Sequence, residues 1–417
     1  MKTLCHIFCL CILLASSIIT TSANTIIDGV IYGRYRISGD LYTGNIVGLE
    51  DKTIFSVRLK SWITLNNKSL SVTIVYKNAF MGCPNLSSVT LPSSITTIQE
   101  KAFFGCSSLQ SITIPKGVKA IDTCTFYGCY KLATVSLPKG LNRIEEGAFC
   151  LCSTLSSINL GDCSLKKIGK NAFMYCDMLK EVSLPPSLTD IGSSAFQGCK
   201  GLTSVVLPPN LSALGSNAFA DCSKISAVTF QNKTVRVSIR DSAFAGCTGL
   251  KSIQMPPTLI YIGKRSFKNC ASLLTADIPG ETASIGECAF QDCRSLGKVV
   301  IPGFVETIGD SAFCGCVALD SVTSLADVPP AMGKDAFRDV SPACVLMVPM
   351  GRTQAYRAAG WSEEVFRGGI REIGAPAGIS TIKVKPSDTR YYDLQGRPVT
   401  RLEKGRIYIH DGRKVVK

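Results

Sequence analysis

Residues 102–122 read AFFGCSSLQSITIPKGVKAID, and the chain repeats this phrase with small variations. A phenylalanine in the same context recurs twelve times, and successive copies lie 23 to 25 residues apart. These phenylalanines are Phe80, Phe103, Phe126, Phe149, Phe173, Phe196, Phe219, Phe244, Phe267, Phe290, Phe313 and Phe337. A fixed period of this length is typical of a solenoid, in which each unit buries its apolar face only against its neighbours. The sequence therefore predicts a repeat solenoid of about twelve units of 23 residues.

The apolar spacing inside one unit predicts its backbone. Steps of three residues lead from Phe103 to Leu109, and this period suits tight helical turns. A step of two separates Ile112 from Ile114, and this period suits a short strand with alternate side chains facing inward. Pro115 should end the strand because proline lacks a backbone donor. We therefore expect an α/β unit of helical turn, strand and return loop, with successive strands aligned in parallel.

A column of cysteines accompanies the phenylalanines. Eleven of the twelve phenylalanines have a cysteine three residues later, whereas the last unit has Val340. The cysteines are Cys83, Cys106, Cys129, Cys152, Cys176, Cys199, Cys222, Cys247, Cys270, Cys293 and Cys316. Zinc sites need four converging ligands, and valine in place of cysteine argues against such a site. We interpret the column as small buried hydrophobes and expect neither a metal nor another cofactor.

Four further cysteines occupy two matching positions of neighbouring units. Cys124 and Cys288 each lie two residues before a repeat phenylalanine, and Cys150 and Cys314 each lie one residue after the next phenylalanine. Both pairs are 26 residues apart, so we hypothesise disulfides Cys124–Cys150 and Cys288–Cys314. Such bridges require Cα atoms within about 7 Å, and free thiols are the alternative.

The two ends of the chain depart from the repeat. Lys2, an apolar run over 4–19 and small residues up to Ala23 predict a secretory signal peptide, and the run is shorter than a typical membrane span. Tyr356 and Trp361 lie where a closing cap should cover the last unit. We divide the chain into a signal peptide (1–23), a strand-rich N-terminal cap (24–75), the repeats (76–340), a C-terminal cap (341–375) and a small β domain (376–417).

The last domain carries much of the positive charge. The whole chain has a formal net charge of +14, and residues 376–417 hold ten lysines or arginines against four acids. A basic tail can attract nucleic acid, anionic glycans or lipid head groups. The repeats lack the interleaved aromatic residues that a nucleic-acid partner requires, so we interpret the tail as a solvated segment read by export machinery.

The repeat unit resembles the BspA-like leucine-rich repeat. Residues 171–192, NAFMYCDMLKEVSLPPSLTDIG, match its pattern closely, and the closing segment from Cys344 to Trp361 is similar to the terminal motif of the family. The resemblance spans residues 76–375. It implies a curved solenoid of parallel strands on a secreted or surface protein of oral or gut bacteria. It also implies adhesion to extracellular-matrix proteins or to other bacteria.

The C-terminal segment resembles a second known module. Tyr391–Arg397, Lys404–Gly405 and Ile407–Ile409 look like the C-terminal sorting domain of exported Bacteroidetes proteins. Such domains direct their cargo across the outer membrane. The resemblance therefore implies a secreted or cell-surface location, with no transmembrane span.

The residues needed for catalysis are scarce or scattered. The two histidines are His6, in the predicted signal peptide, and His410, in the basic tail, so a Ser-His-Asp or Cys-His arrangement would need the tail to fold over the repeats. Glu181 and Asp277 face outward but four rungs apart, which is about 19 Å at about 4.8 Å per rung. That separation is too large for glycoside cleavage. We predict that the protein is not an enzyme, and a carboxylate-based glycan-cleaving enzyme is the enzymatic alternative.

The outward strand positions are the candidate ligand-binding residues, because they form a long ribbon of small polar groups. They are Ser88, Thr90, Ser111, Thr113, Thr134, Ser136, Ser157, Asn159, Glu181, Ser183, Ser204, Ser252 and Gln254. Such ribbons suit extended partners, whereas the alternative is that serine and threonine merely tolerate close stacking. Without an aromatic or arginine cluster, we expect weak binding at each site, made useful by multiplicity.

The function that we predict is adhesion, or binding of extracellular proteins or glycans, by a secreted or cell-surface protein without catalysis. A purely structural coat protein is the alternative. The sequence leaves the ligand and the oligomeric state open.

Overall fold

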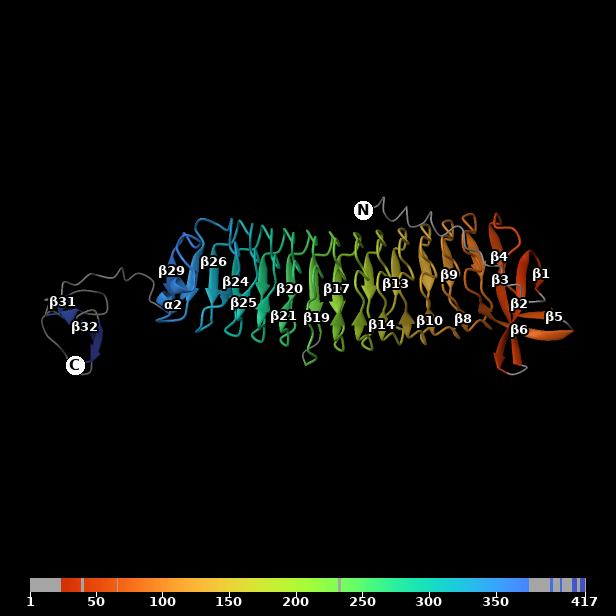
Figure 1. The fold of residues 1–417 in the computed structure, drawn as a ribbon, viewed down its shortest axis with the longest axis horizontal. Helices are drawn as coiled ribbons and strands as arrows, with labels where there is room; N and C mark the ends of the chain where they lie inside the picture. Colours follow the sequence, from red (N-terminus) through yellow and green to blue (C-terminus); the bar gives the residue numbers. More distant parts are fainter. Residues whose placement is uncertain are drawn as a thin grey trace. The chain divides into compact units, whose positions relative to one another are not determined.

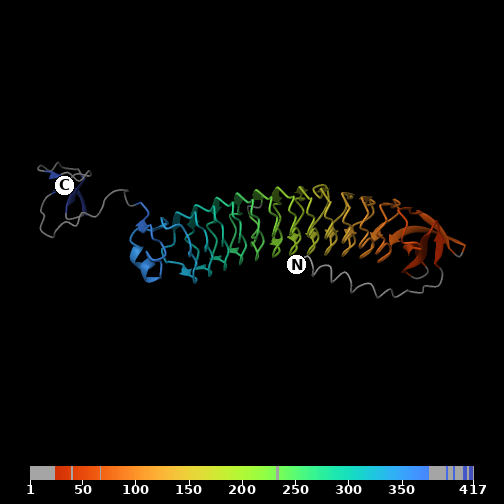
Figure 2. The ribbon, with the colours of Figure 1, turned by 90° about the horizontal axis from the view of Figure 1, so that it is seen from above.

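The structure is a computed structural model that describes residues 24–38, 41–65, 67–231, 234–374, 391–392, 398–399, 407–410 and 413–416. The predicted signal peptide lies outside the described residues. The chain divides into two compact units, Met1–Arg371 and Glu372–Lys417. The first unit is a long stack of short parallel strands, and the stack is gently arched when it is seen from above (Figures 1 and 2).

Each rung contributes one short main strand. These strands are β7 (Ser88–Thr90), β9 (Ser111–Thr113), β11 (Thr134–Ser136), β13 (Ser157–Asn159), β15 (Glu181–Ser183), β17 (Ser204–Leu207), β19 (Ala227–Phe230), β20 (Ser252–Gln254), β22 (Thr275–Asp277), β24 (Lys298–Ile301), β26 (Ser321–Ser324) and β28 (Val345–Val348). Their pairings are parallel and in register, for example Ile158 with Val182. The middle residue of each strand packs inward and its two neighbours face outward, as in Ser157–Asn159. The predicted parallel solenoid is therefore confirmed.

The return loops contain a second row of strands that the sequence analysis did not predict. They are β8 (Thr97–Ile98), β10 (Ala120–Ile121), β12 (Arg143–Ile144), β14 (Lys167–Ile168), β16 (Asp190–Ile191), β18 (Ala213–Leu214), β21 (Tyr261–Ile262), β23 (Ser284–Ile285), β25 (Thr307–Ile308) and β27 (Ala331–Met332). Nine of the ten bury one aliphatic side chain, whereas Met332 of β27 is half-buried. Single parallel bridges through Ile239 join β18 to β21. Each rung is thus hydrogen-bonded to its neighbours along two sides.

The segment around each Ala-Phe pair is a run of tight turns, so the predicted helical turn is wrong. The Cys199 N–H donates to the carbonyl of Phe196, three residues back (3.2 Å), whereas an α-helix bonds four residues back. The Phe196 N–H donates instead to the carbonyl of Ala218 in the next rung (2.8 Å). Ser194 and Gly198 adopt left-handed backbone (φ 55° and 73°) on either side, and such residues interrupt a right-handed helix.

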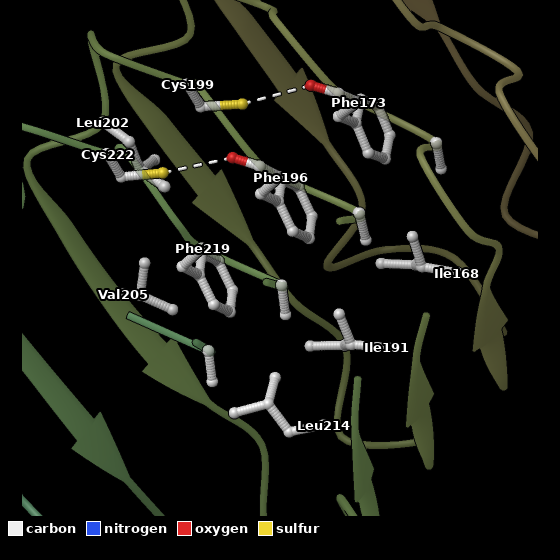
Figure 3. Close-up of a cluster of buried hydrophobic side chains, with 14 of the residues drawn as sticks. Ile168, Phe173, Ile191, Phe196, Cys199, Leu202, Val205, Leu214, Phe219 and Cys222 are labelled. Atoms are coloured by element: carbon white, nitrogen blue, oxygen red, sulfur yellow. Dashed lines mark hydrogen bonds between the residues drawn. The ribbon is translucent and has the colours of Figure 1, made fainter. Parts of the chain in front are cut away.

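The core is a stack of phenylalanine rings that runs through all twelve repeats. Neighbouring rings are stacked with nearly parallel planes, and their centroids lie 4.9 to 5.6 Å apart. The cysteine column lies beside the rings and is fully buried. The Sγ of Cys199 donates to the carbonyl oxygen of Phe173 (3.2 Å), and that of Cys222 donates to Phe196 (3.1 Å), as Figure 3 shows. These thiols therefore act as small core residues that also satisfy a backbone acceptor.

Burial of the thiols predicts a loss of stability at alkaline pH. Burial raises the pKa of Cys247 and of Cys316 to about 12. In the unfolded chain the thiols ionise at about pH 8.5. The contribution of each buried thiol to the free energy of unfolding is therefore complete below that pH. It falls by about 1.4 kcal/mol per pH unit as the pH rises from there toward 12. We expect guanidinium unfolding midpoints, measured under reducing conditions, to fall steeply above pH 9. Cys247→Val should make the fall shallower, since Val340 already occupies this column. An unchanged pH slope in that variant would contradict the prediction.

Within the described residues, the structure contains neither hypothesised disulfide: Cys124, Cys150, Cys288 and Cys314 are not bridged. The reason is that like positions of adjacent rungs stack on each other. A Cβ added at Gly147, which occupies the position of Cys124 in the next rung, would lie 3.0 Å from the Cys124 sulfur. The matching position one residue after the phenylalanine stacks on its own counterpart, as the rings of Phe104 and Tyr127 show with centroids 4.9 Å apart.

The N-terminal cap continues the stack as well as closing it. Its strands are β1 (Thr25–Ile27), β2 (Val30–Ser38), β3 (Leu41–Leu49), β4 (Ser56–Arg58), β5 (Trp62–Leu65) and β6 (Lys68–Val75). The hairpins β1–β2–β3 and β5–β6 are antiparallel. However, β4 pairs in parallel with β7, and β6 pairs in parallel with β8. The cap therefore supplies the first strand of both rows.

The C-terminal cap covers the last phenylalanine with larger side chains. It contains β28, the described helix α2 (Thr353–Ala358) and β29 (Ile370–Glu372). Trp361 is fully buried against Phe337, and its Nε1–H donates to the carbonyl of Pro330 (3.1 Å). The hydroxyl of Tyr356 donates to the carbonyl of Ala326 (2.7 Å).

The second unit contains a small antiparallel sheet. Its described strands are β30 (Tyr391–Tyr392), β31 (Pro398–Val399), β32 (Ile407–His410) and β33 (Arg413–Val416), in the order β31-β30-β32-β33. His410 lies at the end of β32.

Candidate functional site

The main strands present two parallel columns of exposed side chains. All thirteen predicted ligand-binding residues lie in these columns and are exposed. The first column holds Ser88, Ser111, Thr134, Ser157, Glu181, Ser204 and Ser252, and the second holds Thr90, Thr113, Ser136, Asn159, Ser183 and Gln254. Neighbouring members of a column pair directly where their strands are hydrogen-bonded, as Ser157 does with Glu181. We call these two columns the strand-face ribbon.

The ribbon extends beyond the predicted residues. Strand β4 of the N-terminal cap adds Ser56 and Arg58, which pair with Ser88 and Thr90. Strands β22 and β24 add exposed residues at the same two positions, namely Thr275, Asp277, Lys298 and Val300. The signal for these residues was present in the sequence, since each flanks an apolar residue at the centre of a repeat strand. Most residues of the extended ribbon carry hydroxyl groups, and charged residues are fewer.

The ribbon is hollowed between β13 and β19. The hollow has a volume of about 620 Å³ and is lined by both columns of three successive rungs and by the residue after β19. Its polar lining residues are Ser157, Asn159, Glu181, Ser183, Ser204 and Gln231. Five of the six were predicted, and Gln231 was missed because it follows β19 in a unit that is two residues longer than the usual period.

The amide of Asn159 is held in place at the rim of the hollow. Its Oδ1 accepts a hydrogen bond from the Gly161 N–H (3.1 Å), and its Nδ2 donates to the Oδ2 of Asp162 (3.0 Å). Gly161 allows the loop to approach β15 closely, because a Cβ there would lie 2.6 Å from the hydroxyl oxygen of Ser183. One side of the hollow is thus rigid before any ligand arrives.

The carboxylate of Glu181 is available to a ligand. Among the described residues it forms no ion pair, and it is exposed on β15. Hydroxyl groups from Ser157 and Ser204 flank it in the same column. Such a set of groups can accept hydrogen bonds from the hydroxyls of a sugar or from a lysine or arginine of a protein.

The hollow does not assemble an acid pair. Glu181 is its single carboxylate, and Asp277 lies on β22, several rungs away along the stack. Among the residues that the structure describes, no group of three or more acidic, cysteine or histidine side chains could hold a metal ion. Within its lining residues the hollow thus lacks the pair of carboxylates that glycoside cleavage uses.

The comparison with protein families gives one match to the repeats. The sequence profile of the BspA type leucine-rich repeat region, in six copies, matches residues 73–163, 166–296 and 235–342. The chain belongs to the BspA-type leucine-rich repeat family. The phenylalanine and cysteine columns described above lie within the matched residues. The comparison with curated proteins gives no match.

Several solved structures are similar to this BspA-type chain. A leucine-rich cell surface protein from Faecalibacterium prausnitzii is 23% identical with a TM-score of 0.53, and the alignment covers 85% of this chain and 96% of that one. A leucine-rich repeat protein from Bacteroides ovatus is 24% identical (TM-score 0.42, coverage 84% and 99%). The pneumococcal vaccine antigen PcpA is 19% identical (TM-score 0.46, coverage 84% and 98%). Within the described part of the chain, no helix is long and apolar enough to cross a membrane.

Proposed function

We propose that this BspA-type protein is a secreted or cell-surface binding module, and that its strand-face ribbon binds extracellular proteins or glycans without catalysis. The observation that carries the proposal is the alternation along every main strand. In β9, β13 and β20, for example, the central side chain packs in the core, and its two neighbours are exposed polar residues that the core does not need.

The chemistry of the ribbon favours an extended ligand with many hydrogen-bonding groups. Hydroxyls recur at intervals of about 4.8 Å along each column, and the hollow around Glu181 adds a carboxylate and two amides. Each contact is weak by itself. Several contacts along one polymer can raise the overall affinity by a factor of about 10²–10⁴.

The location is part of the same proposal. The similar structure from F. prausnitzii is that of a cell surface protein. The resemblance of the C-terminal tail to a sorting domain also supports export. The partners that we propose are host-matrix proteins, surface glycans or other bacteria.

The experiment is a binding measurement on arrays of matrix proteins and glycans with the chain from residue 24 onward. The double variant Ser157→Lys, Ser204→Lys places a lysine on each side of Glu181 and should weaken binding at least about tenfold, or about 1.4 kcal/mol. Its unfolding midpoint should stay unchanged because both side chains are exposed.

The matched control adds the same charge elsewhere. Thr248→Lys, Val317→Lys changes two exposed residues at a turn position that is already Lys200 and Arg294 in other rungs, and its binding should equal that of the wild type. The absence of saturable binding on either array would favour a structural coat protein. Equal weakening by both double variants would move the binding site away from the ribbon.

A further inference from the structure

A second surface of the solenoid is apolar and exposed. It lies on the loops that follow main strands β24 and β26, where Phe304, Leu325 and Val328 are 73%, 50% and 79% exposed. These side chains line a shallow hollow of about 850 Å³ together with the acidic residues Glu281 and Glu306 and with Asp327. We call these six residues the Phe304 surface. It shares no residue with the strand-face ribbon.

The repeat does not require an apolar residue at position 304. The segment Pro302–Val305 corresponds to Pro115–Val118 of an earlier unit, so Phe304 occupies the position of Gly117. The same position is Gly140, Ser187, Asn210, Thr258 and Glu281 in other units. The neighbouring Val305, which is 2% exposed, supplies the core contact of this loop. A large exposed aromatic ring at such a position is unfavourable in water unless a partner covers it.

The charge around the ring is opposite to that of the chain as a whole. Among the described residues, Glu281 and Glu306 form no ion pair, and the carboxylate of Asp327 meets Arg352 at 3.4 Å while remaining 76% exposed. In the earlier unit the position of Glu306 is Lys119. The net charge of the chain is +14, so three acids beside three exposed apolar side chains form a distinct local feature.

We propose that the Phe304 surface docks a basic segment of a partner protein. One apolar side chain of that segment would insert between Phe304 and Val328, and flanking lysines or arginines would meet Glu281 and Glu306. A cation can also lie over the exposed face of the Phe304 ring. Apolar anchors supply the affinity in such contacts, and the charge pairs orient the segment and speed its association. The acidic rim disfavours an anionic membrane or polysaccharide.

The test uses a fluorescent peptide that has Leu-Trp flanked on each side by two lysines, and the same peptide with glutamates in place of the lysines. Fluorescence anisotropy with the chain from residue 24 onward should show saturable binding of the basic peptide at concentrations up to about 1 mM, the range of weak docking. The acidic peptide should not bind. Binding of the basic peptide should weaken several-fold as the salt concentration rises, because exposed charges are screened.

Two variants assign the binding to this surface. Phe304→Asn introduces the residue that Asn210 already provides at the same repeat position, and Glu306→Lys introduces the equivalent of Lys119. Each variant should weaken binding of the basic peptide at least about tenfold without lowering the unfolding midpoint of the protein. Val317→Asn alters another exposed apolar side chain, 55% exposed, and should leave binding unchanged.

The proposal would be overturned if the basic peptide showed no saturable binding, if both peptides bound equally, or if the Phe304→Asn variant bound the peptide as tightly as the wild type. It would also be overturned if this surface preferred anionic vesicles to the peptide. Self-association that Phe304→Asn abolishes would assign the surface to a second copy of the chain and would also overturn it. The ribbon variant Ser157→Lys, Ser204→Lys should bind the peptide as the wild type does. This last comparison separates failure here from failure of the proposed function.

Discussion

Phe196→Ala should lower the free energy of unfolding by about 3–5 kcal/mol. The ring of Phe196 is fully buried, and its centroid lies 5.1 Å from those of both Phe173 and Phe219. The neighbouring rungs cannot close the resulting cavity, because the backbone on either side is held by hydrogen bonds such as Phe196 N–H to the carbonyl of Ala218 (2.8 Å). Urea unfolding followed by circular dichroism measures the loss.

The position of Phe196 in the middle of the stack adds a second expectation. Each rung contacts only its neighbours, so a weakened rung should uncouple the two halves and lower the slope of the urea transition. Phe304→Ala removes an exposed ring of the same size and is the matched control, with an expected change below about 0.5 kcal/mol. If the two variants lose equal stability, the phenylalanine stack is not the core that we describe.

Trp361→Ala should also cost about 3–5 kcal/mol, and it should act at one end of the solenoid. The indole is fully buried, lies 5.6 Å from the Phe337 ring and 5.8 Å from the Phe366 ring, and donates to the carbonyl of Pro330. Its removal leaves that carbonyl without its side-chain donor and uncovers the apolar end of the last rung. Solenoids need such caps for solubility, so association should accompany the loss of stability.

Differential scanning fluorimetry and sedimentation velocity measure both effects of Trp361→Ala. Trp62→Ala is the control, since the Trp62 side chain is 59% exposed in the N-terminal cap. A variant at Trp361 with the sedimentation coefficient and melting temperature of the wild type would show that the C-terminal cap does not protect the stack.

The core of the solenoid was predictable because its sequence signal is repeated. The phenylalanine and cysteine found at Phe103 and Cys106 recur at the same positions in nearly every unit. Chance similarities do not recur in this way, so the inward-facing positions can be identified from the sequence. The parallel pairing of strands followed from the same regularity. The sequence also indicated which residues cover the last unit, since Tyr356 and Trp361 are large aromatic residues that follow it.

The turns and the second row of strands were not predictable, because both depend on bonds between rungs. The steps of three residues around Phe103 fit a helical turn as well as a run of β-turns. What decides between them is that N–H groups such as that of Phe103 donate to the next rung, here to the carbonyl of Thr125 (2.9 Å). A two-residue strand such as Ala120–Ile121 has no periodicity of its own to detect.

The hypothesised disulfides are absent from the described residues for a related reason. A constant spacing of 26 residues places Cys124 and Cys150 in adjacent rungs, but it does not show that each position stacks on its own counterpart. The hollow at Glu181 was hidden as well. It depends on Gln231 and on the loop at Gly161, which lie where units depart from the regular length.

Each repeat position stacks on the same position of the next rung, and this affects how such proteins can evolve. Nearly every rung offers its neighbours the same rings, thiols and carbonyls, so a new rung copied from an old one meets surfaces that already fit it. Unequal exchange between two repeats of the gene would therefore insert or delete whole rungs in frame, and the protein would become longer or shorter while each junction kept its fit. The length of the solenoid can thus be adjusted in fixed steps without redesign of its interior.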